Sequence, residues 1–348
     1  NTAIGTSALA NNTTASNNSA LGRESLFTNT TGANNTAMGN ASLYNNTTAN
    51  GNTAVGYQAL FANTTGASNV AIGSGALDAN TTANSNVAVG ESSMTANTTG
   101  ARNVAIGESS LMTNTTGSFS TAVGYQALKS TNQSANTAIG HEAMELSTSA
   151  DSCTAVGGQA LKNSTGDDNT AVGRYALLTN TGGALNTAVG YQSLKANTTA
   201  SGNTAVGTNA LLANTTGANN TSVGYNSGTA ITTGGNISIV GVGAGNQITT
   251  GSDNTAMGFD ALTRCTTGSQ NSCFGKTAGD NITTGTHNTC LGIDAGNNIT
   301  QGSAHVCVGD ATQPSAENSQ NEIVIGIGFN GVGSNSFSFG KASNVVSN

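Results

Sequence analysis

Almost the whole chain repeats one stretch, Asn52-Thr53-Ala54-Val55-Gly56-Tyr57-Gln58-Ala59-Leu60-Phe61-Ala62-Asn63-Thr64-Thr65-Gly66-Ala67-Ser68. Its first glycine, Gly56, returns every 17 residues, except for two intervals of 16 that end at Gly140 and Gly173. A fixed period of this length is typical of stacked coils that bury apolar side chains against their neighbours. It predicts an all-β fold, a parallel β-solenoid (β-roll) of about twenty 17-residue coils with a length of about 95 Å. The recurring glycines are Gly5, Gly22, Gly39, Gly56, Gly73, Gly90, Gly107, Gly124, Gly140, Gly157, Gly173, Gly190, Gly207, Gly224, Gly241, Gly258, Gly275, Gly292, Gly309 and Gly326.

The positions within a coil differ in what they tolerate. We number them as slots from 1 at the asparagine, so that Asn52 occupies slot 1 and Gly56 slot 5. Slot 4 is apolar in every copy, which predicts an inward-pointing strand residue, and the glycine after it predicts a bend or a close backbone approach. Slot 3 is nearly always Ala or Cys, which predicts a tight environment. Slot 1 is usually Asn, and its stacked amides are expected to form a structural hydrogen-bonded ladder.

Composition excludes several classes of protein. Only 7% of the 348 residues are charged and 4% are aromatic, and repetition from end to end favours one elongated body over several globular domains. The net charge is -7 with nine scattered basic residues, so no phosphate-binding stripe exists and nucleic-acid binding is not expected. No apolar run approaches the roughly 18 residues of a membrane helix. The chain begins inside a coil without Met or a signal sequence, which predicts a processed or excerpted piece.

The side chains predict three segments. Residues 1–223 form regular coils with Leu or Met in slot 9 and usually Asn in slot 12. Residues 224–309 form variant coils, and in four of them slot 9 becomes Gly and slot 12 becomes Ile, as in Gly245 and Ile248. This exchange conserves apolar volume and predicts that slots 9 and 12 face one core. Residues 310–348 contain the only proline, Pro314, and are expected to be a transition or capping segment.

The chemistry-bearing residues are sparse. Cys273, Cys290 and Cys307 occupy slot 3 of successive coils, either as stacked free thiols or as partners in a disulfide between coils or chains. Paired C-x-x-C ligands are absent, so no zinc site is expected. The three histidines lie far apart in the sequence, which leaves no nucleophile–base–acid constellation. We therefore expect no enzyme activity, no catalytic residue, no metal and no cofactor.

Two sets of residues are candidate surface sites. Slots 6 and 10 vary freely and are expected to face outward, so that slot-6 tyrosines can stack on sugars or are ordinary scattered surface residues. These tyrosines are Tyr57, Tyr125, Tyr191 and Tyr225. Slot-12 asparagines followed by x-Thr are N-glycosylation sequons, or else Asn and Thr ladders. The sequons include Asn46, Asn63, Asn80, Asn97 and Asn214.

The repeated motifs resemble two groups of surface proteins. The Asn-Thr-Ala-Val-Gly core resembles coils of trimeric autotransporter adhesin heads, which are left-handed parallel β-rolls associating in threes, although the period of 17 is longer. The longer form, at residues 186–199, is similar to repeats of phage tail fibres and other surface fibres. In those fibres a segment like Asn321-Glu322-Ile323-Val324-Ile325-Gly326 often precedes a self-cleaving chaperone of the endosialidase type. The resemblance implies a homotrimeric fibre located outside the cell or on a virion.

Two functions follow as expectations. The first is a structural and adhesive fibre, a tail-fibre or appendage shaft that presents a repetitive surface to cell-surface glycans or a surface receptor. Its partner is expected to be itself in a parallel homotrimer, joined through the Asn, Ala and Gly of slots 1, 3 and 5. The alternative is that these small residues line the interior of a lone solenoid. The second function is an ice-binding Thr-rich solenoid, which is disfavoured because the adjacent Thr64 and Thr65 should point to opposite faces.

Overall fold

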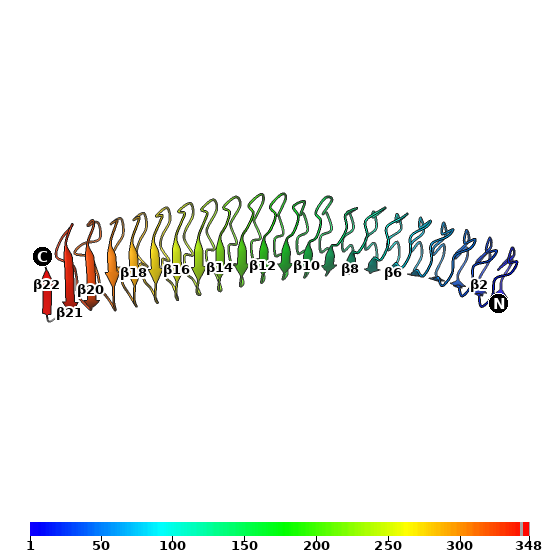
Figure 1. The fold of residues 1–348 in the computed structure, drawn as a ribbon, viewed down its shortest axis with the longest axis horizontal. Helices are drawn as coiled ribbons and strands as arrows, with labels where there is room; N and C mark the ends of the chain where they lie inside the picture. The colour runs from blue at the N-terminus through cyan, green and yellow to red at the C-terminus, as the bar shows by residue number, and fades with distance from the viewer. Residues whose placement is uncertain (342–343, 348) are drawn as a thin grey trace. The chain divides into compact units, whose positions relative to one another are not determined.

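The structure of the protein is a computed structural model and describes residues 1–341 and 344–347. The chain divides into two compact units, Asn1–Val172 (unit 1) and Gly173–Asn348 (unit 2). Each unit is a stack of coils in which one short strand per coil pairs with the strand of the next coil (Figure 1). The predicted all-β, parallel β-solenoid fold is confirmed. The change of core side chains expected at residue 224 lies inside unit 2.

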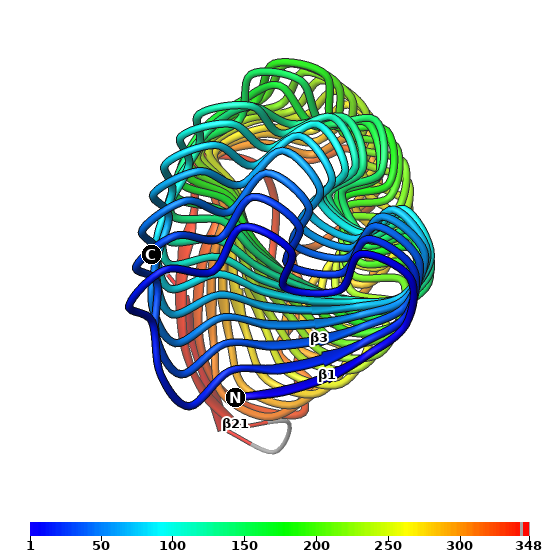
Figure 2. The same cartoon turned by 90° about the vertical axis from the view of Figure 1, so that its right-hand side faces the viewer.

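Unit 1 contains eleven strands that pair in parallel with their sequence neighbours in register, so that slots 2, 3 and 4 stack on slots 2, 3 and 4. In the view along the coils, β1 and β3 lie on the same side of the stack (Figure 2). The strands are β1 (Thr2–Ile4), β2 (Ser19–Leu21), β3 (Thr36–Met38), β4 (Thr53–Val55), β5 (Val70–Ile72), β6 (Val87–Val89), β7 (Val104–Ile106), β8 (Thr121–Val123), β9 (Thr137–Ile139), β10 (Thr154–Val156) and β11 (Thr170–Val172).

Unit 2 continues the same pattern until its last pair of strands. β12 to β21 pair in parallel, whereas β22 runs antiparallel to β21. The reversal falls within the segment expected to cap or end the repeat, of which residues 342–343 and 348 lie outside the described residues. The strands are β12 (Thr187–Val189), β13 (Thr204–Val206), β14 (Thr221–Val223), β15 (Ser238–Val240), β16 (Thr255–Met257), β17 (Ser272–Phe274), β18 (Thr289–Leu291), β19 (Val306–Val308), β20 (Ile323–Ile327), β21 (Phe337–Lys341) and β22 (Asn344–Ser347).

The slot-5 glycines are required by a close approach between coils. Gly124 has a φ of 135°, a region that L-residues with a side chain rarely adopt. A Cβ on Gly124 would lie 2.5 Å from the carbonyl oxygen of Gly140 in the next coil. The predicted close backbone approach is confirmed, and it explains why no other residue occupies the slot.

The interior of each coil is lined by slots 1 and 3, not by slot 4. Ala122 in slot 3 is fully buried, whereas the slot-4 side chain of Ile106 is 41% exposed. The prediction that slot 4 forms the core is therefore wrong, and so is the prediction that slots 1, 3 and 5 face another chain. Alternation along a strand separates the two sets of slots. Where slot 9 holds a buried Leu, as in the coil of Leu128, the interior leaves room only for a small slot-3 side chain. Slots 1 and 3 line the interior formed by the chain's own coils, as the alternative prediction stated for these small residues.

The large core side chains come from the turn opposite the strand. Slot-9 leucines such as Leu60 and Leu128 are fully buried and adopt a left-handed φ near 50°. In the variant coils a Cβ on Gly245 would meet Cδ1 of Ile248 at 2.9 Å and Cδ1 of Ile239 at 2.7 Å. Slots 9 and 12 thus share one core, as predicted, and the slot-3 side chain of Ile239 contributes to it as well.

Two columns of buried asparagines join the coils. In slot 1, Asn52 donates through Nδ2 to the carbonyl of Gly66 (2.9 Å) and accepts through Oδ1 from the backbone N–H of Asn69 (2.9 Å). In slot 12, Asn63 Nδ2 donates to Asn46 Oδ1 (3.0 Å) as well as to the carbonyl of Gly66 (2.9 Å). Slot 1 is structural, as predicted, but its amides bridge backbone groups more than they bond each other. Satisfying these buried polar groups offsets the cost of removing them from water.

The slot-12 ladder leaves no access to the glycosylation sequons. Each sequon asparagine is fully buried, and each donates its Nδ2 within the ladder or to its own turn. A glycan on Nδ2 would need space that the folded coil does not have. In the folded coils, Asn46, Asn63, Asn80, Asn97 and Asn214 thus form the asparagine ladder that was the alternative interpretation of the sequons.

Candidate functional site

One surface of each unit is a repeated apolar column. The outward side chains of slots 2 and 4, which we call the sheet face, combine Thr, Ser, Val or Ile in slot 2 with a larger apolar residue in slot 4. A contiguous exposed apolar surface on a soluble protein marks an interaction site more often than chance. The exposed slot-4 residues of unit 1 include Leu21, Met38, Ile72, Ile106, Ile139 and Val172, and those of unit 2 include Val240, Met257 and Leu291.

The second surface is formed by slots 7, 10 and 11, and its chemistry changes along the coils. In unit 2 it is hollowed between slot 7 on one side and slots 10 and 11 on the other, and we call the whole surface of these slots the variable groove. Backbone hydrogen bonds hold both sides in register, as between Asn209 N–H and Tyr191 O (2.9 Å) and between Ala213 N–H and Thr229 O (3.1 Å). The slot-10 side chains are half-buried here rather than fully outward as predicted. A fixed frame with variable side chains is the arrangement expected of a surface that presents binding groups.

In unit 1 the variable groove carries aromatic and then charged groups. Phe27, Tyr44 and Phe61 stack in successive coils, with ring centroids 5.1 and 5.3 Å apart. Further along, Lys162 Nζ pairs with Glu142 (2.7 Å) and Glu145 (2.9 Å). The hydrogen bond from Lys162 lowers the pKa of the Glu142 carboxyl and in turn raises the pKa of the Lys162 ammonium. The rings therefore pack on one another and the charged groups pair with one another, so the side chains of both stretches already have partners within the chain.

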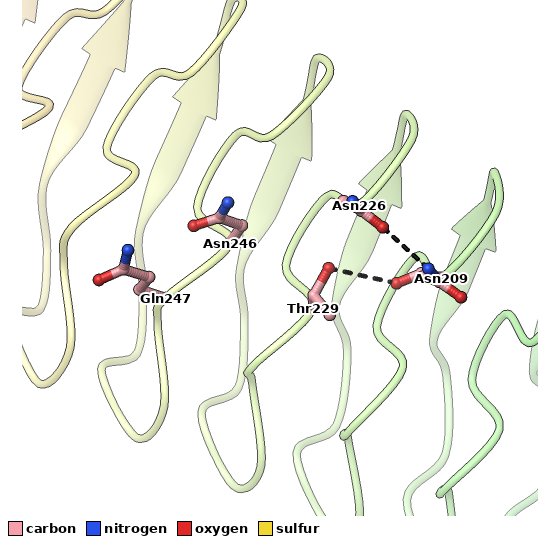
Figure 3. A pocket seen from close by; sticks show the side chains of 5 residues that line it. All are labelled: Asn209, Asn226, Thr229, Asn246 and Gln247. Atoms are coloured by element: carbon pink, nitrogen blue, oxygen red, sulfur yellow. Dashed lines mark hydrogen bonds between the residues drawn. The ribbon is translucent and has the colours of Figure 1, made fainter.

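In unit 2 the variable groove opens into a cavity lined by amides. Its volume is about 400 Å³, and its lining residues come from slots 7, 10 and 11 of three successive coils (Figure 3). Asn209 Nδ2 donates to Asn226 Oδ1 (2.9 Å), and the Thr229 hydroxyl contacts the Asn209 carbonyl at 3.4 Å. The lining residues are Asn209, Asn226, Thr229, Asn246 and Gln247. None was singled out from the sequence, because their proximity depends on the turn and on residues 17 positions apart.

The four candidate tyrosines are exposed but do not form one site. Their exposed fractions are 56% for Tyr57, 41% for Tyr125, 44% for Tyr191 and 55% for Tyr225. Slot 6 thus faces outward, as predicted. The tyrosines are separated by intervening coils, and two of them pack on neighbours: Tyr125 stacks on His141 with centroids 5.5 Å apart, and Tyr191 meets Tyr175 edge-on.

All five cysteines are buried free thiols. Cys273, Cys290 and Cys307 lie in register on β17, β18 and β19, so the stacked-thiol alternative describes this structure. Burial raises the pKa of Cys153 to about 11 and that of Cys265 to about 12. Hydrogen bonding with Cys273, together with burial, raises the pKa of Cys290 well above its ordinary value. Buried thiols with raised pKa are unreactive.

His305 occupies slot 1 and reproduces the hydrogen bonds of the asparagine that usually stands there. Its Nε2 lies 2.8 Å from the Ser319 carbonyl, and its Nδ1 accepts from the Glu322 backbone N–H at 3.2 Å. Nε2 therefore carries the proton, and the ring is a neutral donor and acceptor. Burial lowers its pKa below 6.5. A proton on Nδ1 would face the Glu322 N–H, donor against donor.

We expect the coil around His305 to lose stability in acid. Because the folded-state pKa is lowered, the unfolded chain binds more protons as the pH falls below about 6.5, and the contribution of the neutral ring is lost from there downward. His305→Asn keeps one donor and one acceptor and should remove this part of the pH dependence. Hydrogen exchange of the amides of Val306 to Val308 between pH 7 and pH 5 measures it. The protection factors, which correct each rate for the slower intrinsic exchange at pH 5, should fall in the parent and not in His305→Asn. An equal fall in both would contradict the assignment.

The remaining tests for a site are negative. Among residues 1–341 and 344–347, no three His, Cys, Asp or Glu side chains gather closely enough to hold a metal ion. A search of the same residues finds no helix with the length and hydrophobicity needed to cross a membrane. No protein-family model matches the chain, and no curated protein matches it. The fold and its surfaces thus define a β-solenoid repeat protein with a constant sheet face and a variable groove.

Proposed function

We propose that the chain is a segment of a structural and adhesive fibre whose copies associate through the sheet face. The observation that carries this proposal is the row of apolar slot-4 side chains, one per coil on both units, each of which is exposed or half-buried. A repeated apolar column has the same spacing on every copy, so copies aligned in parallel match coil against coil. Three copies around one axis are favoured by the resemblance to trimeric fibres. The variable groove then stays free for attachment outside the cell or on a virion.

Association through this face depends on many coils together. Burying the exposed part of one slot-4 side chain stabilises a complex by only about 1 kcal/mol. Joining two chains costs at least about 4 kcal/mol in lost freedom of motion. A few coils therefore cannot hold two copies together, whereas a long stack can. Changes on several neighbouring coils should have a cooperative effect on assembly.

We expect Ile72→Asp, Ile106→Asp and Ile139→Asp together to give folded monomers. Each side chain is 41% exposed, so a carboxylate stays hydrated in the monomer, but its burial between chains costs several kcal/mol. Sedimentation velocity should show the parent as an oligomer and the variant near 34.1 kDa, with unchanged circular dichroism. Thr48→Asp, Thr65→Asp and Thr82→Asp add the same charge on exposed slot-14 residues and should leave the oligomer intact. A monomeric parent would refute the proposal.

Ice binding is a second candidate that uses the same sheet face. Slot-2 threonines such as Thr53 lie on the face that also carries slot 4, at the strand spacing of about 4.8 Å. The slot-2 row, rather than the pair Thr64 and Thr65, is therefore the candidate ice-binding row. Val70, Val87 and Val104 interrupt it. A face buried in a fibre is not available to ice. Thermal hysteresis of a monomeric parent would favour ice binding, and its absence in an oligomeric parent would favour the fibre.

A further inference from the structure

The amide cavity of unit 2 has hydrogen-bonding capacity that the protein does not use. Asn209 Oδ1 and Asn246 Oδ1 are shielded from solvent, and neither accepts a hydrogen bond. Native structures rarely leave such acceptors unpaired, because a buried polar atom without a partner is destabilising. The backbone N–H groups of Asn209, Asn226 and Gln247 are already engaged with neighbouring coils. The free capacity at Asn209 and Asn246 therefore belongs to their side chains.

The chemistry of the lining selects a neutral ligand. Four carboxamides and one hydroxyl line the cavity, and no charged side chain is among them. An anion would meet carbonyl oxygens, and a cation would find no carboxylate. After a rotation of the Asn209 and Asn246 side chains that turns their shielded Oδ1 atoms toward the cavity, a molecule with many hydroxyl groups can donate to these atoms and accept from the Nδ2 groups.

The neighbouring part of the variable groove extends this cavity. A second cavity of about 350 Å³ is formed by slots 7, 10 and 11 of the coils just before it. Leu212 lies there in slot 10 of the coil that also contributes Asn209 to the amide cavity. Ala196, Leu212 and Ala213 form an apolar wall, and Gln192 and Lys195 supply polar groups. Apolar and hydrogen-bonding surfaces thus follow one another along the coils.

We propose that this part of the variable groove binds a neutral oligosaccharide chain. Its hydroxyl groups bond the amides around Asn209 and Asn246, and the C–H faces of its rings pack on the apolar wall around Leu212. The inference rests on the adhesive part of the proposed function and names its ligand class. It does not depend on assembly through the sheet face, because the groove residues lie in slots 7, 10 and 11 rather than in slots 2 and 4.

Titration with neutral hexasaccharides of glucose and of N-acetylglucosamine tests the proposal. The side-chain amide signals of Asn209, Asn226, Asn246 and Gln247 are followed in nitrogen–proton correlation spectra. At least one hexasaccharide should shift them saturably. Asn246→Leu copies the leucine found in slot 10 at Leu212 and should weaken binding about tenfold, the loss expected for one hydrogen bond. Thr95→Leu makes a comparable slot-10 change in unit 1 and should leave the affinity unchanged.

Two results would overturn the site. One is the absence of any saturable shift, or equal affinity of the parent and Asn246→Leu. The other is a shift of the same amides by calcium chloride and not by the sugars, which would make the free acceptors a cation site. The same titration on the triple Asp variant of the sheet face separates the two proposals. Sugar binding by a monomer would support the groove whatever the parent's oligomeric state.

Discussion

Replacing Gly124 with alanine is expected to lower the free energy of unfolding by about 2–6 kcal/mol. The φ of 135° is unfavourable for alanine by about 1–3 kcal/mol, and overlap with the next coil adds about 1–3 kcal/mol. The new Cβ would lie 2.5 Å from the Gly140 carbonyl oxygen and 2.7 Å from its carbonyl carbon. Gly140 cannot retreat without stretching its 2.8 Å hydrogen bond to Val123. Urea unfolding followed by circular dichroism measures the loss.

The matched control is Gly51→Asn. Gly51 also has a positive φ, of 70°, but the nearest atom to an added Cβ is Ser68 Oγ at 3.8 Å. Asn34 occupies the same slot 17 with a φ of 60°. This change should stay within about 0.5 kcal/mol of the parent. If Gly124→Ala were as mild as Gly51→Asn, contact between the slot-5 backbones would not be the reason for the glycine period.

The glycine period allowed the fold to be predicted because it reports a backbone constraint. A residue such as Gly124 fits only where two backbones nearly touch, and that condition recurs once per coil. Strand alternation also placed slots 2 and 4 on one face and slots 1 and 3 on the other. It did not decide which face points inward. We assigned the larger side chains to the core, whereas the interior is filled from the opposite side by residues such as Leu128 and leaves room only for Ala122.

The variable groove was beyond prediction for a different reason. Its amide cavity joins Asn209, Asn226 and Asn246, which are neighbours only through stacking and through the left-handed turn at slots 7 and 9. Slot 7 varies from coil to coil, so no repeated signal marks it. The exposure of slot 6 was predictable from its variability, but exposure of Tyr225 alone does not make a site.

The coil with Gly245 in slot 9 has a large slot-3 side chain, Ile239, which indicates that slot 3 points into the same core as slot 9. Gly245→Leu tests this interpretation. The φ of Gly245, 56°, already suits leucine, since Leu60 has 53° in the same slot. The side chain would nevertheless overlap Cδ1 of Ile239 in slot 3 and Cδ1 of Ile248 in slot 12. Overpacking of this kind costs about 1–3 kcal/mol. We expect thermal unfolding to show that loss for the single substitution.

Restoring the volume should restore the stability. The next coil combines Ala256 in slot 3 with Leu262 in slot 9 and Cys265 in slot 12. Giving the coil of Gly245 the same three side chains requires Ile239→Ala, Gly245→Leu and Ile248→Cys. The triple variant should unfold within about 1.5 kcal/mol of the parent, as volume-conserving exchanges do. The single changes Ile239→Ala and Ile248→Cys leave cavities and should each be destabilising. A triple variant that is more stable than the sum of the three single losses predicts requires the three side chains to share one interior. Additive losses would mean that slot 3 does not contact slots 9 and 12.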